Sequence, residues 1–316
     1  MKVISIIIPT YNRRALLRDA LGYLLDGEVP GLECVVVDDG STDGTYEEIE
    51  EWRNRWGESR IVYLRQGKNQ GAQHARNRGI AESKGDLVIF MDSDDVAITS
   101  GLADLRDFLE INPQLDFCYG KVRKTDDTLK SLKDDDDIGM SFTNTPYEIA
   151  GYHWHTMGAL YRRECLELVG PWSVELTGSQ DWEYQARVKL SGARGEFVDT
   201  MVGYWRQHEG ERVGTKKFRP DYVRSVMIAC DSILSKARQA RMSDEMLERR
   251  IAKKLVAHAL EWGANGFLSE RKECFDQAVL SVSEKSAFTN LIRCVSVFPR
   301  VFDSSFLRLI GKASNL

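Results

Sequence analysis

The sequence predicts an α/β fold, in which a mostly parallel sheet is flanked by helices and followed by a helical C-terminal region. From residue 1 to about 110, short apolar runs alternate with segments that carry apolar residues at helical spacing. Polar residues follow three of these apolar runs directly, and beyond residue 220 only the helical spacing remains. Such alternation is typical of βαβ units, whose strands run parallel and whose helices cover both faces of the sheet.

The predicted strands of the first part are short and apolar. Val3–Ile8 is rich in β-branched residues and is closed by Pro9, which is typical of a strand buried on both faces. The further predicted strands are Cys34–Val37, Ile61–Leu64 and Leu87–Met91, and the predicted helices are Asn12–Leu25, Thr45–Trp56 and Gly71–Ser83. Because ligands of open α/β sheets bind at the carboxyl ends of the strands, the residues after these strands are the first candidates for a site.

The pattern changes twice further along the chain. Between residues 111 and 219 it is irregular, and from Asp221 onward apolar residues recur at helical spacing. Pro220 marks the candidate junction. We therefore expect one domain over residues 1–219 and a helical region over residues 220–316, with no internal repeat.

The composition allows a sizeable core and excludes several classes of protein. Of the 316 residues, 42% are hydrophobic and 29% are charged, which excludes global disorder, and the net charge of −5 argues against nucleic acid as the main partner. The apolar stretch at Met1–Pro9 is too short for a signal peptide, and no apolar run approaches the roughly 20 residues of a membrane helix. The six cysteines are scattered, so we expect reduced thiols in a cytoplasmic protein.

An acidic run, Asp92-Ser93-Asp94-Asp95, directly follows the predicted strand Leu87–Met91. Adjacent carboxylates repel one another unless a cation lies among them, and oxygen ligands suit Mg²⁺ or Mn²⁺. A solvated acidic turn is the alternative. Asp134–Asp137 has the same pattern but follows no buried strand, so we interpret that run as a solvated loop.

A second acidic pair follows another predicted strand, in Asp38-Asp39-Gly40-Ser41. Gly40 allows a tight turn, and Ser41 can cap the helix that follows. A carboxylate at this place can accept a hydrogen bond from the N–H of a base, or it can serve only as a helix cap. The residues alone leave both interpretations open.

Five motifs, taken together and in this order, resemble those of the family 2 glycosyltransferases, which have the GT-A fold. They are Ile6-Ile7-Ile8-Pro9-Thr10-Tyr11-Asn12, Val37-Asp38-Asp39-Gly40-Ser41, Gly71-Ala72-Gln73-His74-Ala75-Arg76-Asn77, Phe90-Met91-Asp92-Ser93-Asp94-Asp95 and Ser179-Gln180-Asp181-Trp182-Glu183. The resemblance covers roughly residues 1–215, and the fifth motif has Gln180 where the family has Glu. It implies a Rossmann-like sheet with a nucleotide-binding half over residues 1–110 and an acceptor-binding half over residues 111–219.

The resemblance implies transfer of a sugar from a nucleotide diphosphate donor, with inversion, and with uridine as the expected base. Carried over position by position, the nucleotide-binding residues are Pro9, Thr10, Tyr11, Asp39, Arg76, Asn77, Asp92 and Ser93. Asp94 would bind the metal, Mn²⁺ or Mg²⁺, that spans the diphosphate. His208 would also ligate it, although Trp205 is one residue more than the family segment has, and a polar surface histidine is the alternative.

The same resemblance assigns the acceptor side of the site. Asp181 would be the general base that takes the proton of the attacking acceptor hydroxyl. It can equally cap the helix predicted at Trp182–Leu190, and one residue can do both. Gln180, Trp182 and Trp154 would contact the acceptor, unless Trp154 is simply a partly buried aromatic residue. A zinc site at His153 and His155 is not expected, because no third ligand is nearby.

Two further segments have an expected role. Glu209–Lys217 is charged, contains two glycines and is a candidate loop for closing over the donor. Leu291–Ile310 mixes apolar and basic residues, so we expect it to pack on the protein or on a second subunit, with peripheral contact to the inner face of the membrane as the alternative. The expected partners are a nucleotide sugar and a glycan or lipid-linked saccharide acceptor.

The sequence thus predicts an inverting, metal-dependent glycosyltransferase of cell-surface polysaccharide assembly. A catalytically inactive GT-A scaffold that binds glycan or a partner protein is the main alternative, and intact Asp94 and Asp181 argue against it. A nucleotidyltransferase would carry a glycine-rich loop after the first strand, and Pro9–Arg14 has no glycine. A dinucleotide oxidoreductase would need a Gly-x-Gly-x-x-Gly motif, which follows none of the early strands.

Overall fold

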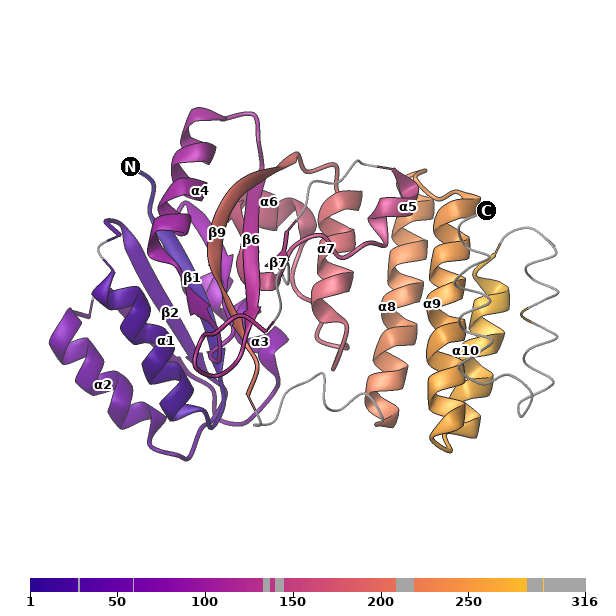
Figure 1. The fold of residues 1–316 in the computed structure, drawn as a ribbon, viewed down its shortest axis with the longest axis horizontal. Helices are drawn as coiled ribbons and strands as arrows, with labels where there is room; N and C mark the ends of the chain where they lie inside the picture. The colour runs from indigo at the N-terminus through magenta and orange to yellow at the C-terminus, as the bar shows by residue number, and fades with distance from the viewer. Residues whose placement is uncertain are drawn as a thin grey trace. The chain divides into compact units, whose positions relative to one another are not determined.

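The computed structural model describes residues 1–27, 29–58, 60–132, 137–139, 145–208, 219–282 and 292. The chain forms two compact units, coloured along the chain in Figure 1. The first, here called the sheet unit, comprises residues 1–142, 152–174 and 191–210, and the second, the helical unit, comprises residues 143–151, 175–190 and 211–316. This grouping follows compactness, whereas the predicted division at residue 219 follows the change of sequence pattern near Pro220 and stays a prediction.

The sheet unit holds a mixed sheet with helices around it. Its strands are β1 Ile4–Thr10, β2 Leu32–Asp38, β3 Ile61–Arg65, β4 Leu87–Phe90, β5 Val96–Ala97, β6 Phe117–Thr125, β7 Asp137–Ile138, β8 Ala159–Arg162 and β9 Gly195–Arg206. Its helices are α1 Arg14–Asp26, α2 Thr45–Trp56, α3 Ala72–Glu82, α4 Thr99–Ile111, α6 Arg163–Val169 and the short 3₁₀ helix η1 Thr156–Gly158. The strand order is β3-β2-β1-β4-β8-β6-β9-β5, with β7 paired to β6.

The first four strands are parallel, as the alternation of strands and helices predicts. β1 pairs in parallel with both β2 and β4, and β2 pairs in parallel with β3. β8 runs antiparallel to its neighbours β4 and β6, while β6 and β9 are parallel. Every residue of β1 and β2 is buried, which explains their largely apolar sequence. The buried Ser5 hydroxyl donates to the Glu33 carboxylate at 2.6 Å. The predicted α/β fold with a mostly parallel sheet is therefore confirmed.

Helices cover both faces of the sheet. Ile6 and Ile8 of β1 share one core cluster with Leu21 of α1 and Leu105 of α4. Ile7 points to the opposite face, because successive side chains of a strand alternate. There α3 comes so close that a Cβ atom at Gly79 would overlap the Ile7 side chain. The strand β1, from whose carboxyl end one of the candidate segments leaves, is thus packed on both faces.

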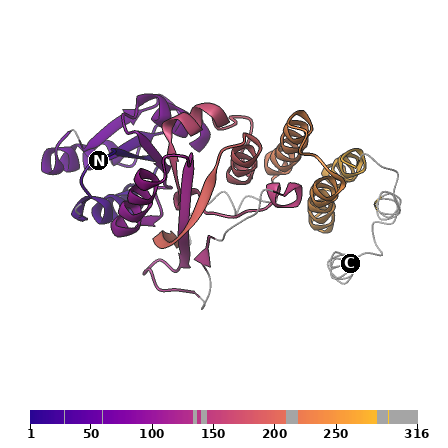
Figure 2. The ribbon, with the colours of Figure 1, turned by 90° about the horizontal axis from the view of Figure 1, so that it is seen from above.

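The helical unit consists of α5 Pro146–Ile149, α7 Gln180–Leu190, α8 Pro220–Gln239, α9 Glu245–Ala264 and α10 Leu268–Leu280. Figures 1 and 2 show α7 to α10 side by side, from the side and end-on. Their apolar faces form one core, with Ala186, Val226, Ile233, Leu255 and Phe275 among its buried residues. The predicted helical C-terminal region is therefore present.

Two predicted segments lie outside the described residues. They are Glu209–Lys217 and, apart from Ile292, Leu291–Ile310. Asp134–Asp136 also lies outside, whereas Asp137 forms an ion pair with Arg123. None of the described helices combines the length and the apolar character that a membrane crossing requires.

Candidate functional site

Polar residues that follow β1, β2 and β4 lie at one edge of the sheet unit. Thr10 and Asp38 are paired in register at the ends of β1 and β2, and the backbone N–H of Asp39 donates to the Thr10 carbonyl at 2.9 Å. β4 ends beside β1, where Phe90 is paired with Ile7. The parallel order of the strands therefore brings these sequence-predicted positions to one place.

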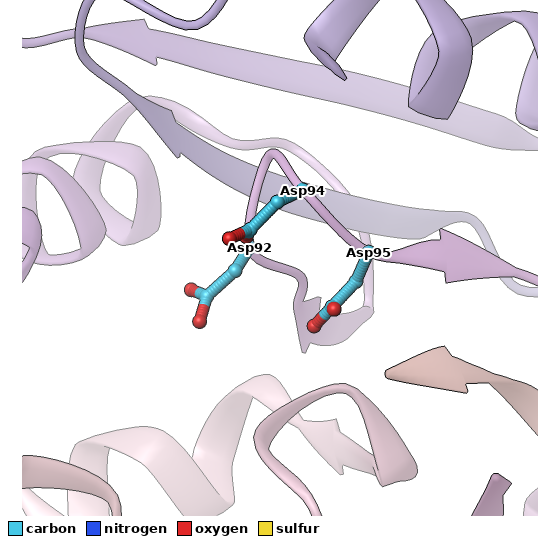
Figure 3. A group of neighbouring side chains, drawn as sticks. All are labelled: Asp92, Asp94 and Asp95. Atoms are coloured by element: carbon cyan, nitrogen blue, oxygen red, sulfur yellow. The ribbon is translucent and has the colours of Figure 1, made fainter. Parts of the chain in front are cut away.

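Three aspartates form an acidic cluster in the turn between β4 and β5, drawn in Figure 3. One carboxylate oxygen from each of Asp92, Asp94 and Asp95 lies within 4.8 Å of the other two. Asp94 and Asp95 are buried, at 7% and 1% exposed. Asp92 and Asp94 are predicted site residues, whereas Asp95 belongs to the same acidic run but carries no predicted role.

Three basic side chains surround this acidic cluster. Oδ2 of Asp94 lies 2.9 Å from Nη1 of Arg13 and 2.9 Å from Nε2 of His208. Oδ1 of Asp92 lies 2.6 Å from Nη2 of Arg76. The structure therefore brings His208 and Arg76 to the aspartates, as expected of site residues, and adds Arg13. Their roles toward a ligand stay predictions.

The charges of the cluster are strongly coupled. Burial, with the neighbouring charges of Asp94 and Asp92, raises the pKa of Asp95 well above its usual value. Burial also opposes ionisation of Asp92, but Arg76 outweighs it together with other nearby cations and keeps the pKa of that carboxyl below its usual value. A cation among the three carboxylates would relieve their repulsion. Carboxylate oxygens with one imidazole fit Mg²⁺ or Mn²⁺, so the residues present suit a divalent metal.

Arg206, at the end of β9, fixes the backbone of this turn. Its Nε donates to the Asp94 carbonyl at 2.8 Å, and its backbone N–H donates to Oδ1 of Asp95 at 3.2 Å. Its Nη1 reaches Asp19 of α1 at 3.4 Å. The acidic turn is thus held by a buried guanidinium that has no predicted role in the sequence.

Arg76 itself is positioned by Trp172. The guanidinium carbon lies 4.6 Å from the centroid of the Trp172 ring, which is a cation–π contact. Asn77, the next residue, makes two hydrogen bonds with the backbone of Trp172. Its Nδ2 donates to the Trp172 carbonyl at 2.9 Å, and its Oδ1 accepts from the Trp172 N–H at 2.8 Å. Asn77 therefore has a clear structural role, and its predicted contact with the nucleotide stays a prediction.

Asp39 locks the loop that leads into α3. Its carboxylate accepts from Nε2 of Gln66 at 2.5 Å and from the backbone N–H groups of Gln70 and Gly71 at 2.9 and 2.6 Å. Gly71 has φ 96°, a left-handed conformation that favours glycine. Asp39 is only 3% exposed, and it holds another loop instead of capping the helix that follows it in the chain. Its predicted role toward the base stays a prediction.

The other predicted nucleotide residues differ in exposure. Pro9, Thr10 and Ser93 are buried, the last two at 3% and 2% exposed. Tyr11 is 43% exposed, so part of its ring is accessible to a ligand. Among these four residues, Tyr11 is therefore best suited for stacking on a base.

The predicted acceptor residues Gln180, Asp181 and Trp182 form the first turn of α7, in the helical unit. Asp181 is half-buried, and its Oδ1 accepts from the N–H of Trp182 at 2.8 Å. Nε1 of Trp182 donates to the Ala150 carbonyl at 2.8 Å. The helix begins two residues earlier than predicted, which places Asp181 inside its first turn. The role of Asp181 as a base stays a prediction.

Trp154 lies in the core of the sheet unit. It is 1% exposed, its ring centroid is 4.9 Å from that of Tyr119, and its Nε1 donates to the Tyr161 hydroxyl at 3.0 Å. Trp154 is thus buried more deeply than the partly buried aromatic residue that the sequence offers as the alternative. A contact with the acceptor stays a prediction.

Several residues at the acidic cluster have no predicted role. They are Arg13, Asp95, His155, Trp172 and Arg206. The sequence does hold a signal for Asp95, which belongs to the acidic run, and for Arg13, which directly follows the first motif. Trp172 has none, because its contacts with Asn77 join positions 95 residues apart.

Comparisons with known proteins agree with the fold and the motifs. A family model described as Glycosyl transferase family 2 matches residues 5–169. EpsH of Bacillus subtilis (strain 168) is 26% identical over 227 residues, covering 65% of this chain and 61% of EpsH. The GalNAc(5)-diNAcBac-PP-undecaprenol beta-1,3-glucosyltransferase of Campylobacter jejuni subsp. jejuni is 33% identical over 106 residues, covering 33% of this chain and 34% of that protein. The chain thus spans less than two thirds of both relatives.

The solved structures extend the likeness along the chain. The crystal structure of S. aureus TarS 1-349 in complex with UDP-GlcNAc superposes with a TM-score of 0.70 at 20% identity, covering 99% of this chain and 91% of that one. This likeness shows a common GT-A fold. The family model covers more than half of the 316 residues. The chain therefore belongs to glycosyl transferase family 2, and one of its relatives is named a putative teichuronic acid biosynthesis glycosyltransferase.

Proposed function

We propose that the chain transfers a sugar from a nucleotide diphosphate sugar to a hydroxyl of a glycan or lipid-linked acceptor, with inversion and with a divalent cation. The observation that carries this proposal is the acidic cluster after β4 with basic side chains on it. A charged cluster of both signs at the carboxyl ends of parallel strands suits a diphosphate and its metal.

The donor would bind across this edge of the sheet unit. Arg13 and Arg76 are cations next to the acidic cluster, and guanidinium groups bind phosphate oxygens well. The half-exposed ring of Tyr11 can stack on the base. TarS, of like fold, was solved with UDP-GlcNAc, which favours a uridine donor here.

The cation would be held by the acidic cluster, with Asp94 as the main ligand and His208 beside it. When bound, it neutralises the charge that develops on the departing diphosphate. Arg206 serves this site by holding the backbone carbonyl of Asp94 and the carboxylate of Asp95 in place. Trp172 serves it by fixing the orientation of Arg76.

Asp181 would act on the acceptor. Inversion requires the acceptor hydroxyl to attack the anomeric carbon from the side opposite the diphosphate, and a carboxylate there takes the hydroxyl proton as the new bond forms. The hydrogen bond from the Trp182 N–H fixes the orientation of the Asp181 carboxylate and leaves Oδ2 for that proton.

The acceptor class is suggested by a relative. The Campylobacter jejuni enzyme is named for an acceptor linked to undecaprenol through a diphosphate. A lipid-linked acceptor places the reaction at the inner face of the membrane and the enzyme in the cytoplasm. An inactive scaffold that binds glycan is the second candidate. Sugar transfer that depends on Asp181 would distinguish the enzyme from such a scaffold.

Calorimetry tests the donor part of the proposal. UDP, dTDP and GDP are each titrated into the full chain, once with Mn²⁺ and once with EDTA. We expect one nucleotide, UDP, to bind tightly with Mn²⁺ and at least about tenfold more weakly with EDTA. Asp94→Asn should remove most of this difference, whereas Asp127→Asn, an exposed aspartate on the same unit, should not. Nucleotide affinity that is the same with Mn²⁺ and with EDTA, or no binding of any of the three nucleotides, would contradict the proposal.

A further inference from the structure

The two peptide groups that flank Tyr11 are both hydrogen-bonded to the loop that follows β2. On one side, the carbonyl of Thr10 accepts from the backbone N–H of Asp39 at 2.9 Å. On the other side, the backbone N–H of Asn12 donates to Oγ of Ser41 at 2.9 Å. Because peptide groups are planar, the two planes beside a residue set its backbone direction. These bonds therefore fix the backbone of Tyr11 relative to Asp39.

The side chain of Asn12 adds a further bond between the same two loops. Its Oδ1 accepts from the backbone N–H of Thr42 at 2.8 Å. Asn12 has φ 50°, in the left-handed region, which asparagine tolerates better than most residues other than glycine. An asparagine at this position therefore supplies the acceptor oxygen and also adopts the backbone conformation in which these bonds form.

The loop after β2 is itself held by the neighbouring strand. Oδ1 of the buried Asp38 accepts from the backbone N–H of Ser41 at 2.7 Å, and its Oδ2 accepts from the hydroxyl of Tyr63 on β3 at 2.6 Å. Nη2 of Arg65, at the end of β3, donates to the Ser41 carbonyl at 3.0 Å. Asn12 is thus bonded to a loop whose position does not depend on Asn12.

The two predicted base contacts differ in how they are held. The carboxylate of Asp39 is enclosed and bonded to the loop before α3. The side chain of Tyr11 is 43% exposed, so packing holds its ring only in part, and the direction of the ring depends on the backbone that carries it. Fixing that backbone before a ligand arrives lowers the entropy lost on binding.

We propose that Asn12 is a positioning residue of the donor site, which holds Tyr11 in place relative to Asp39 for the base of the nucleotide. Asn12 would act through Tyr11 without touching the donor. This inference rests on the proposed function, in which the base lies against Tyr11. It adds the residue that sets the geometry of the base contacts, and the side of the donor on which that residue acts.

The diphosphate side of the site should not depend on the Asn12 side chain. Arg13 is ion-paired with Asp94, and the backbone N–H of Arg14 donates to Oδ2 of Asp43 at 2.9 Å. These contacts hold the chain that follows Asn12. Loss of the Asn12 side chain should therefore affect binding of the base alone, whereas a general loss of structure would affect both parts of the donor.

The test compares UDP with inorganic pyrophosphate, which has the diphosphate but no base. Each is titrated calorimetrically, with Mn²⁺, into the full chain. We expect Asn12→Gly, which keeps the left-handed backbone and removes the bond to Thr42, to weaken binding of UDP by about tenfold. The affinity for pyrophosphate should change by less than about twofold. Asn12→Asp, which keeps an acceptor oxygen and the backbone conformation, should lose less than about threefold of the affinity for UDP.

The matched control is Asn54→Ala, which changes an exposed asparagine of α2 and should keep both affinities within about twofold. Urea unfolding of each variant shows whether the fold is retained. Equal affinity of wild type and Asn12→Gly for UDP, or an equal loss for UDP and pyrophosphate, would overturn the inference. Failure of the proposed function would show in the wild type itself, if UDP, dTDP and GDP all bound no more tightly than pyrophosphate, and the inference would fall with it.

Discussion

His208 and Asp94 are in contact, with Nε2 of the imidazole 2.9 Å from Oδ2 of the carboxylate, although 114 residues separate them. The contact forms because β9 pairs with β5, directly after the acidic turn, and carries the chain back to it. The same oxygen also meets Arg13. One carboxylate thus joins the segment between β1 and α1, the acidic turn and the segment that follows β9.

His208→Ala should weaken binding of Mn²⁺ about 10–100-fold, because an imidazole beside the metal ligand either binds the metal or orients that ligand. Titration of Mn²⁺ in the presence of UDP measures this. His74→Ala, a histidine on α3, is the control and should have no effect. If the affinity of His208→Ala for Mn²⁺ equals that of the wild type, His208 has no role in metal binding.

Trp172→Leu should weaken donor binding by about tenfold, because Arg76 loses the ring on which its guanidinium lies. Trp172→Phe keeps an aromatic face and should lose far less. Calorimetry with UDP and Mn²⁺ distinguishes the two variants. If both lose the same affinity, the volume of the side chain matters and the cation–π contact does not.

Asp39→Asn should destabilise the fold by about 1–3 kcal/mol, because an amide replaces one acceptor oxygen with a donor that faces the N–H groups of Gln70 and Gly71. Urea unfolding measures the free energy. Asp127→Asn changes an exposed aspartate and should cost nothing measurable. An unchanged free energy of unfolding in Asp39→Asn would mean that the hydrogen bonds of the Asp39 carboxylate contribute little to stability.

Lys189 should make stability rise with pH. It is 1% exposed, and burial lowers its pKa to about 7 from the ordinary 10.5. Between these values the unfolded chain binds more protons than the folded chain, so the free energy of unfolding should increase with pH by up to about 1.4 kcal/mol per unit. Below about pH 7 the full cost of the buried charge remains.

Lys189→Met should abolish this rise of the free energy of unfolding with pH. Lys236 is exposed, so Lys236→Met should keep the rise. Urea unfolding of the wild type and both variants at about pH 6.5, 8 and 9.5 checks the difference. Parallel pH dependence in all three proteins would show that Lys189 is not the group responsible.

The first part of the fold is predictable because its signals are local. The apolar run of β1 and the helical spacing of α2 give their positions directly, and α2 has the predicted bounds Thr45–Trp56. The place of the site follows from the same pattern, since parallel strands bring their carboxyl ends together. Asp92 and Asp94 could therefore be found from the sequence.

The remaining contacts are not predictable, because they join distant segments. Trp172 reaches Arg76 only after α3 has packed on the sheet, and no periodicity marks it. The contact of Lys254 with the Trp182 ring depends on the packing of α9 near α7, and nothing in the local sequence around Lys254 predicts it. Trp154 is predicted to be at least partly accessible, but it is fully enclosed by other aromatic rings of the core.

The central claim is that Asp181 is the general base of glycosyl transfer. A single-turnover assay of Asp181→Asn, with the nucleotide sugar that binds and a diphosphate-linked acceptor, tests it most directly. We predict that the transfer rate falls by about 10²–10⁴-fold, while the affinity for UDP with Mn²⁺ stays within about twofold of the wild type. Transfer at the wild-type rate by Asp181→Asn would contradict the account.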